Sequence, residues 1–122
     1  MHDFGREERV GAAMRRELSV LVREEIKDPR LGMITIQEVR VSRDLSHAKV
    51  YYTVLDDTRI KQTQQVLDKA ANFLRRRLGE HMVLRSVPQL HFVYDKSVVE
   101  GMRLSALIEE AVTRDRKSHG ED

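Results

Sequence analysis

The chain has 122 residues, of which 40% are hydrophobic and 34% are charged, and its net charge is +2. This length and composition fit one folded domain with a modest core and exclude a disordered protein. The chain has no cysteine, no apolar run near the ~20 residues of a membrane span and no signal-peptide core at its start, so a cytoplasmic protein without disulfides or thiolate metal sites is expected.

The first predicted element is an amphipathic helix from about residue 5 to residue 27. Its apolar side chains recur at three- and four-residue steps, at Val10, Met14, Leu18, Leu21, Val22 and Ile26. Pro29 ends the helix, because proline has no backbone N–H and its ring disfavours helical geometry at the residue before it.

A β-hairpin is predicted next. The strand at 33–42 has apolar residues that change phase between Ile36 and Val39, which predicts a bulge near Gln37 and Glu38. A polar turn leads into a second strand, at 47–56, whose inward residues are Ala48, Val50, Tyr52 and Val54. Two strands joined by a turn of about five residues form an antiparallel hairpin.

The residue pattern in the second half of the chain predicts a helix, a strand and a further helix. Asp57 or Thr58 can cap a helix that ends near Gly79, with Ile60, Leu67, Ala71, Leu74 and Leu78 facing inward. Pro88 begins a third strand with Leu90, Phe92 and Tyr94 on one face. A capping box at Ser97–Glu100 then starts a final helix with Met102, Ala106, Leu107 and Ala111 or Val112 inward.

This order predicts an α+β fold with a three-stranded sheet backed by helices on one face. The helix between the second and third strands is the kind of crossover that joins parallel strands. Residues 1–113 are expected to form the single domain, and residues 114–122 a polar, flexible tail.

Groups suited to catalysis are few. His47, His81 and His91 show no metal-ligand spacing, and no phosphate-binding glycine loop occurs. Asp44 and His47 could form an acid–base pair, but Asp44 is better suited to accept hydrogen bonds in the hairpin turn. We therefore expect no enzyme, no cofactor, no bound metal and no small-molecule substrate.

Positive charge is concentrated in residues 69–103, which hold seven basic and three acidic side chains. A helical projection places Gln62, Gln65, Lys69, Asn72 and Arg76 on the outer face of the second helix, with Arg75 and Arg77 on either side. Amides and cations of this kind suit a ribose-phosphate backbone. Arg85 before the third strand and Arg43 in the hairpin turn could join them by folding.

Asn72 leaves the second helix open to two interpretations. Asparagine tolerates unusual backbone angles, so a break at Ala70, Ala71 and Asn72 would give the two helices of a type-II KH domain. A straight helix with Asn72 exposed would cost less than ~1 kcal/mol, and the residues alone favour it. The GxxG loop of ordinary KH domains is absent, since no two glycines are three residues apart.

Five dispersed segments strongly resemble bacterial ribosome-binding factor A. They are IKDPRLG at 26–32, SRDLSHAKVY at 42–51, AANFLRRRLG at 70–79, RSVPQLHFVYD at 85–95 and S-x-x-x-G-x-R-x-S-x-L-I at 97–108. The resemblance covers nearly the whole chain in order. It implies a type-II KH-like fold, α-β-β-α-(kink)-α-β plus a C-terminal helix, in which an Ala-x-Gly kink replaces the GxxG loop. Asn72 stands at the glycine position, and the resemblance favours the kink there.

The resemblance also implies a function. The family binds the small (30S) ribosomal subunit and its 16S rRNA, assists late maturation that includes 5′-end processing of the precursor rRNA, and is linked to growth in the cold. A monomer that meets other assembly factors would fit this activity. Two other classes stay open: a basic domain that docks an acidic protein without RNA, distinguished by nuclease-insensitive binding, and a small enzyme that loses turnover on His47→Ala.

Overall fold

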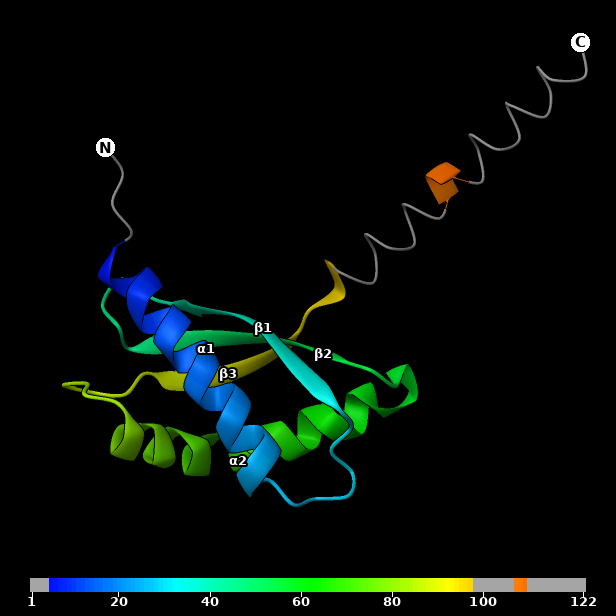
Figure 1. Cartoon of the computed structure of the whole chain (residues 1–122), viewed down its shortest axis with the longest axis horizontal. Helices are drawn as coiled ribbons and strands as arrows, with labels where there is room; N and C mark the ends of the chain where they lie inside the picture. The colour runs from blue at the N-terminus through cyan, green and yellow to red at the C-terminus, as the bar shows by residue number, and fades with distance from the viewer. Residues whose placement is uncertain (1–4, 98–106, 110–122) are drawn as a thin grey trace, which may run out of the picture.

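The computed structural model describes residues 5–97 and 107–109. Within them the chain forms α1 (Arg6–Glu25), β1 (Ile34–Val41), β2 (His47–Val54), a 3-10 turn (Asp57–Arg59), α2 (Ile60–His81) and β3 (Gln89–Tyr94). β1 and β2 pair antiparallel, and β2 and β3 pair parallel, in the strand order β1-β2-β3 (Figure 1). The α+β fold, the hairpin and the parallel crossover are confirmed. Apart from residues 107–109, which are helical, the predicted capping box beyond Ser97 and final helix lie outside the described residues.

Both helices pack on one face of the sheet, α1 mainly against β1 and α2 mainly against β3. Most of the strand residues predicted to face inward are buried there, including Val50 and Tyr52, which are fully buried. From the helices, Met14 and Leu18 of α1 and Leu74 of α2 complete the same core. Tyr94 is only half-buried. The other face of the sheet carries no element among the described residues, so its side chains are open to solvent.

The predicted bulge is confirmed, because the β1–β2 register shifts between Ile36 and Glu38. The shift lets both Ile36 and Val39 point into the core. A contact that sequence reasoning missed lies beside it. Gly11 of α1 is buried, and a methyl group at that position would collide with the backbone carbonyl of Val39. The glycine therefore sets how closely α1 approaches β1.

The start of α2 differs from the prediction. Asp56, and not Asp57 or Thr58, provides a cap, and it caps the 3-10 turn that precedes α2: its Oδ1 accepts from the Thr58 backbone N–H at 3.0 Å and from the Thr58 hydroxyl at 2.7 Å. The 3-10 turn that follows delays the α-helix to Ile60. Asp56 is the cap because its side chain reaches the backbone N–H of the residue two positions later.

The predicted division of this segment into two helices is wrong. α2 is one helix of 22 residues that passes through Ala70, Ala71 and Asn72 without interruption. Asn72 does not adopt a left-handed conformation, because Leu45 is the one non-glycine residue with positive φ among those described. Two alanines are good helix formers, and the buried stripe continues on both sides of them, at Leu67 and Leu74. Packing against the sheet thus keeps the helix whole.

A polar network also fixes α2 on the sheet. The buried Tyr52 hydroxyl donates to Oε1 of Gln64, whose Nε2 donates to the Phe92 carbonyl at 2.8 Å and to Oδ1 of Asp68 at 2.9 Å. Burial raises the pKa of Tyr52 to about 12, so the phenol remains a donor at neutral pH. The network aligns one face of α2 with the sheet and leaves the opposite face to solvent.

Candidate nucleic-acid interface

The outward residues of α2 form a polar row that we call the α2 outer row. All five predicted members are exposed: Gln62, Gln65, Lys69, Asn72 and Arg76. At a rise of 1.5 Å per residue the row is about 21 Å long. Asp68 is also exposed at its edge, where Gln64 binds its carboxylate. The structure therefore gives this row the exposure that a phosphate-binding surface needs.

Arg76 and Lys69 are the cations of the row. The guanidinium carbon of Arg76 lies 5.6 Å from the centre of the Phe73 ring, a cation–π contact that positions the charge while leaving its N–H groups to solvent. Lys69 lies one helical turn from Asn72. The hydrogen bonds of Arg30 are the main cause that lowers the pKa of Asp28, and the charge of Lys69 adds a smaller effect. An ammonium and a guanidinium on one exposed helix face can each bind a phosphate.

The two flanking arginines have protein acceptors instead. Arg75 is half-buried, and its Nε donates to the Val87 carbonyl at 3.0 Å, which ties α2 to the loop before β3. Arg77 forms an ion pair with Glu25 of α1, with Nη2 2.6 Å from Oε1, and a second one with Glu80. Both were predicted as candidate RNA-binding residues, and the structure separates them from the exposed row.

Arg43 and Arg85 lie at the same end of the sheet. Arg43 is exposed in the β1–β2 turn, and Arg85 is exposed in the loop between α2 and β3. These two segments are adjacent, because the Gln89 N–H donates to the Ser46 carbonyl at 2.9 Å, and Figure 1 shows both at the end of the molecule where α2 ends. Folding thus brings the two segments that carry these arginines to one end of the domain.

The loop between α1 and β1 lies beside the start of α2. The buried Thr63 hydroxyl accepts from the Gly32 N–H at 3.1 Å, and Arg59 donates to the Pro29 carbonyl at 3.1 Å. Arg30 binds Asp28, with Nη2 2.8 Å from Oδ2, and its hydrogen bonds are the main cause that lowers the pKa of Asp28 to about 2. Sequence reasoning missed Thr63; a threonine within the apolar stripe of α2 was the available signal.

Asp44 serves the hairpin turn. Its Oδ1 accepts from the Ser46 and Ser42 hydroxyls at 2.7 Å each and from the Ser46 N–H at 3.1 Å. These bonds lower the pKa of Asp44 to about 2, which makes it a poor general base at neutral pH. His47 bonds with His91 of β3 instead, Nδ1 to Nε2 at 2.9 Å. The turn chemistry predicted for Asp44 is confirmed.

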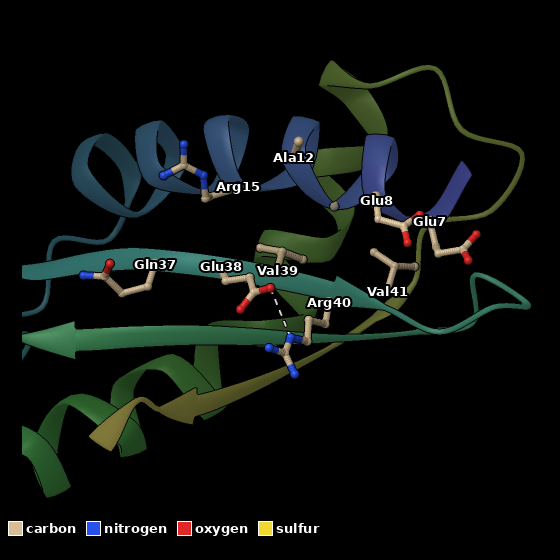
Figure 2. Close-up of a pocket in the computed structure, with 10 residues that line it drawn as sticks. Glu7, Glu8, Ala12, Arg15, Gln37, Glu38, Val39, Arg40 and Val41 are labelled. Carbon is tan, nitrogen blue, oxygen red and sulfur yellow. Dashed lines mark hydrogen bonds and ion pairs between the residues drawn. The ribbon is translucent and has the colours of Figure 1, made fainter. Parts of the chain in front are cut away.

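A groove lies between the N-terminal half of α1 and β1 (Figure 2). Its volume is about 460 Å³, and it is lined by acids and bases of both elements, including Glu7, Glu8, Arg15 and Arg40. Bulges and charged side chains are usual protection for an edge strand. The groove brings together none of the predicted site residues.

Two further searches cover only residues 5–97 and 107–109. In that part of the chain no helix is long and apolar enough to cross a membrane. The same residues contain no cluster of three or more histidine, aspartate or glutamate side chains that could hold a metal ion.

Comparison with known sequences identifies the family. The sequence profile described as ribosome-binding factor A matches residues 6–108. The chain belongs to the ribosome-binding factor A family. It is 57% identical over 122 residues to ribosome-binding factor A of Azotobacter vinelandii, covering 97% of this chain and 95% of the relative. It is 55% identical over 121 residues to that of Thioalkalivibrio sulfidiphilus, covering 98% and 94%.

Solved structures of the family share the fold. The crystal structure of ribosome-binding factor A from Thermus thermophilus has a TM-score of 0.66 at 26% identity and covers 75% of this chain and 97% of its own. A solution structure from Thermotoga maritima, described as a putative ribosome binding factor A, has a TM-score of 0.67 at 25% identity and covers 76% and 90%. A Thermus thermophilus homology model fitted into a cryo-EM map of a 30S complex has a TM-score of 0.62 at 27% identity, covering 70% and 91%. The KH-like α+β fold is therefore that of the family.

Proposed function

We propose that this protein binds the small (30S) ribosomal subunit through 16S rRNA and assists late maturation, including 5′-end processing of the precursor rRNA. The observation that carries the proposal is the exposed α2 outer row on a chain that belongs to a family of ribosome-binding factors. The Thermus thermophilus relative fitted into a 30S complex supports the choice of subunit.

The contact residues in this proposal are Lys69, Asn72 and Arg76, with Arg43 and Arg85 at the adjacent end of the domain. Lysine and arginine bind phosphates, and the Asn72 amide can both donate to and accept from ribose or base groups. Arg75 and Arg77 position α2 through their protein acceptors and make no RNA contact in this proposal. The protein then acts by holding one rRNA conformation, as a cytoplasmic monomer that performs no covalent chemistry.

Sedimentation of the tagged protein in a cell lysate tests the proposal. We expect it to travel with free small subunits, and not with translating ribosomes, at low salt. Nuclease treatment should release it from fractions that contain rRNA. A protein that stays at the top of the gradient would contradict ribosome binding, and nuclease-insensitive capture would favour docking to an acidic protein.

A deletion strain tests the maturation step. We expect 16S precursor with an unprocessed 5′ end to accumulate, more at low temperature than at high temperature. Complementation with the wild-type chain should restore processing, whereas a Lys69→Ala, Arg76→Ala double variant should restore it only in part. Normal processing in the cold in the deletion strain would contradict the proposed step.

A further inference from the structure

The face of the sheet that points away from both helices carries a row of basic side chains. Strand register places Arg40 of β1 opposite Lys49 of β2, and Lys49 beside His91 of β3. All three side chains are exposed. Figure 2 shows Arg40 on the side of β1 away from α1, whereas Val39 and Val41 point toward that helix. We call Arg40, Lys49 and His91 the sheet basic row; it spans two strand spacings, about 10 Å.

Two charged members of the row, Arg40 and Lys49, stand directly opposite each other on neighbouring strands. Like charges directly opposite one another on neighbouring strands repel. The row has one carboxylate partner among the described residues, Glu38, whose Oε1 lies 3.1 Å from Arg40 Nε. Lys49 has no ion pair in that part of the chain, although it lies between the other two members. An anionic ligand would relieve the repulsion.

The surroundings of the row favour nucleic acid over protein. The cores of protein interfaces are apolar and depleted of charge. Among the described residues the neighbouring apolar groups are Tyr51 and Val93, both half-buried, and the Arg40 guanidinium carbon lies 5.5 Å from the centre of the Tyr51 ring. Cations beside aromatic and imidazole rings are the groups that bind phosphates and stack on bases. His47, bonded to His91, extends the set along the sheet.

We propose that the outer face of the sheet is a second rRNA-binding surface, in which Lys49 and Arg40 bind phosphates. This inference rests on the proposed function. Because α2 covers the inner face of the sheet, its outer row and the sheet basic row lie on opposite sides of the domain. The protein is then held between two segments of rRNA, and it can fix their separation during maturation.

Chemical acetylation of lysines, read by mass spectrometry, tests this arrangement directly. In the free protein Lys49 and Lys69 should both react readily. In the complex with small subunits both should be protected several-fold. Protection of Lys69 without Lys49 would overturn the second surface and leave the proposed function intact. Protection of Lys49 already in the free protein would also overturn it, because another part of the chain or a second copy would then cover the face. Failure to sediment with the subunit would instead contradict the proposed function.

Binding to protein-free 16S rRNA across a salt series separates RNA from protein as the occupant. Lys49→Ala should flatten the slope of log affinity against log salt by roughly 0.7–0.9, and Lys49→Arg should restore it. The control is Thr35→Ala, which changes an exposed residue opposite Thr53 without changing charge, and it should leave the slope unchanged. If Lys49→Ala weakened binding to the subunit but left binding to the rRNA unchanged, the face would dock a protein and the proposal would be wrong.

Discussion

The guanidinium group of Arg77 on α2 binds the carboxylate of Glu25 at the end of α1, with Nη2 2.6 Å from Oε1 and Nε 2.9 Å from Oε2. The two side chains are only 30% and 27% exposed. Their hydrogen bonds are the main cause that raises the pKa of Arg77 and lowers that of Glu25. One arginine of the triplet thus joins the two helices, while its neighbour Arg76 points to solvent.

Arg77→Ala should therefore lower the stability of the fold. Removing the guanidinium leaves a partly buried carboxylate on Glu25 without its partner, which is more costly than losing an exposed charge. Arg76→Ala is the matched control and should change the free energy of unfolding by no more than about 0.5 kcal/mol. Thermal unfolding of both variants measures the difference. An equal midpoint for the two would show that the pair contributes nothing to stability.

Lys69→Ala and Arg76→Ala should each weaken rRNA binding at low salt. Each lost phosphate contact should flatten the slope of log affinity against log salt by roughly 0.7–0.9, since fewer counterions are released on binding. Arg75→Ala provides the comparison, because its side chain binds the Val87 carbonyl, and its slope should equal that of the wild type. An unchanged slope for Arg76→Ala would remove the α2 outer row from the interface.

Asn72→Ala should stabilise the protein by a few tenths of a kcal/mol, and Asn72→Gly should destabilise it by a similar amount. Asn72 is exposed within a continuous helix, so helix propensity decides both signs. Gln65→Ala on the same row should change little. Denaturant midpoints followed by circular dichroism provide the measurement. The opposite ranking, with glycine preferred, would indicate a kinked backbone at this position.

Gly11→Ala should destabilise the fold, although alanine is the better helix former. The added methyl group would meet the Val39 carbonyl, and overpacking of this kind typically costs about 1–3 kcal/mol. Ala12→Gly, at the exposed position next to it, should cost ~1 kcal/mol through propensity alone. Chemical unfolding of the two variants checks the prediction. A stabilising Gly11→Ala would mean that α1 can move away from β1 without loss.

Acid should weaken the hairpin turn through Asp44. Because its folded pKa of about 2 is below that of an unfolded aspartate, near 4, its stabilising contribution is present above about pH 4. That contribution is lost as the pH falls from about 4 toward 2. The free energy of unfolding should therefore fall less for Asp44→Asn than for the wild type between pH 5 and pH 2.5, because this range covers most of the titration of Asp44. Equal losses in the two proteins would show that the turn bonds do not depend on charge at Asp44.

Local sequence patterns were sufficient to predict several features of this protein. The strand phase change between Ile36 and Val39 located the bulge, because side chains alternate strictly along a strand. The helical projection of α2 identified the exposed row, because 3.6 residues per turn fixes which side chains face the core. The dispersed segments at 26–32 and 85–95 were specific enough to indicate the family, which the match to residues 6–108 confirms.

Only the tertiary structure showed which basic side chains are exposed and which are bonded to other parts of the protein. The helical projection placed Arg75 and Arg77 beside Arg76, but it could not show that both bind protein acceptors, because Val87 and Glu25 come from other segments of the chain. The continuity of α2 through Asn72 likewise depends on packing against the sheet, which outweighs the weak preference of one residue. The sheet basic row exists only through strand register, since Arg40, Lys49 and His91 become neighbours when three separate segments pair.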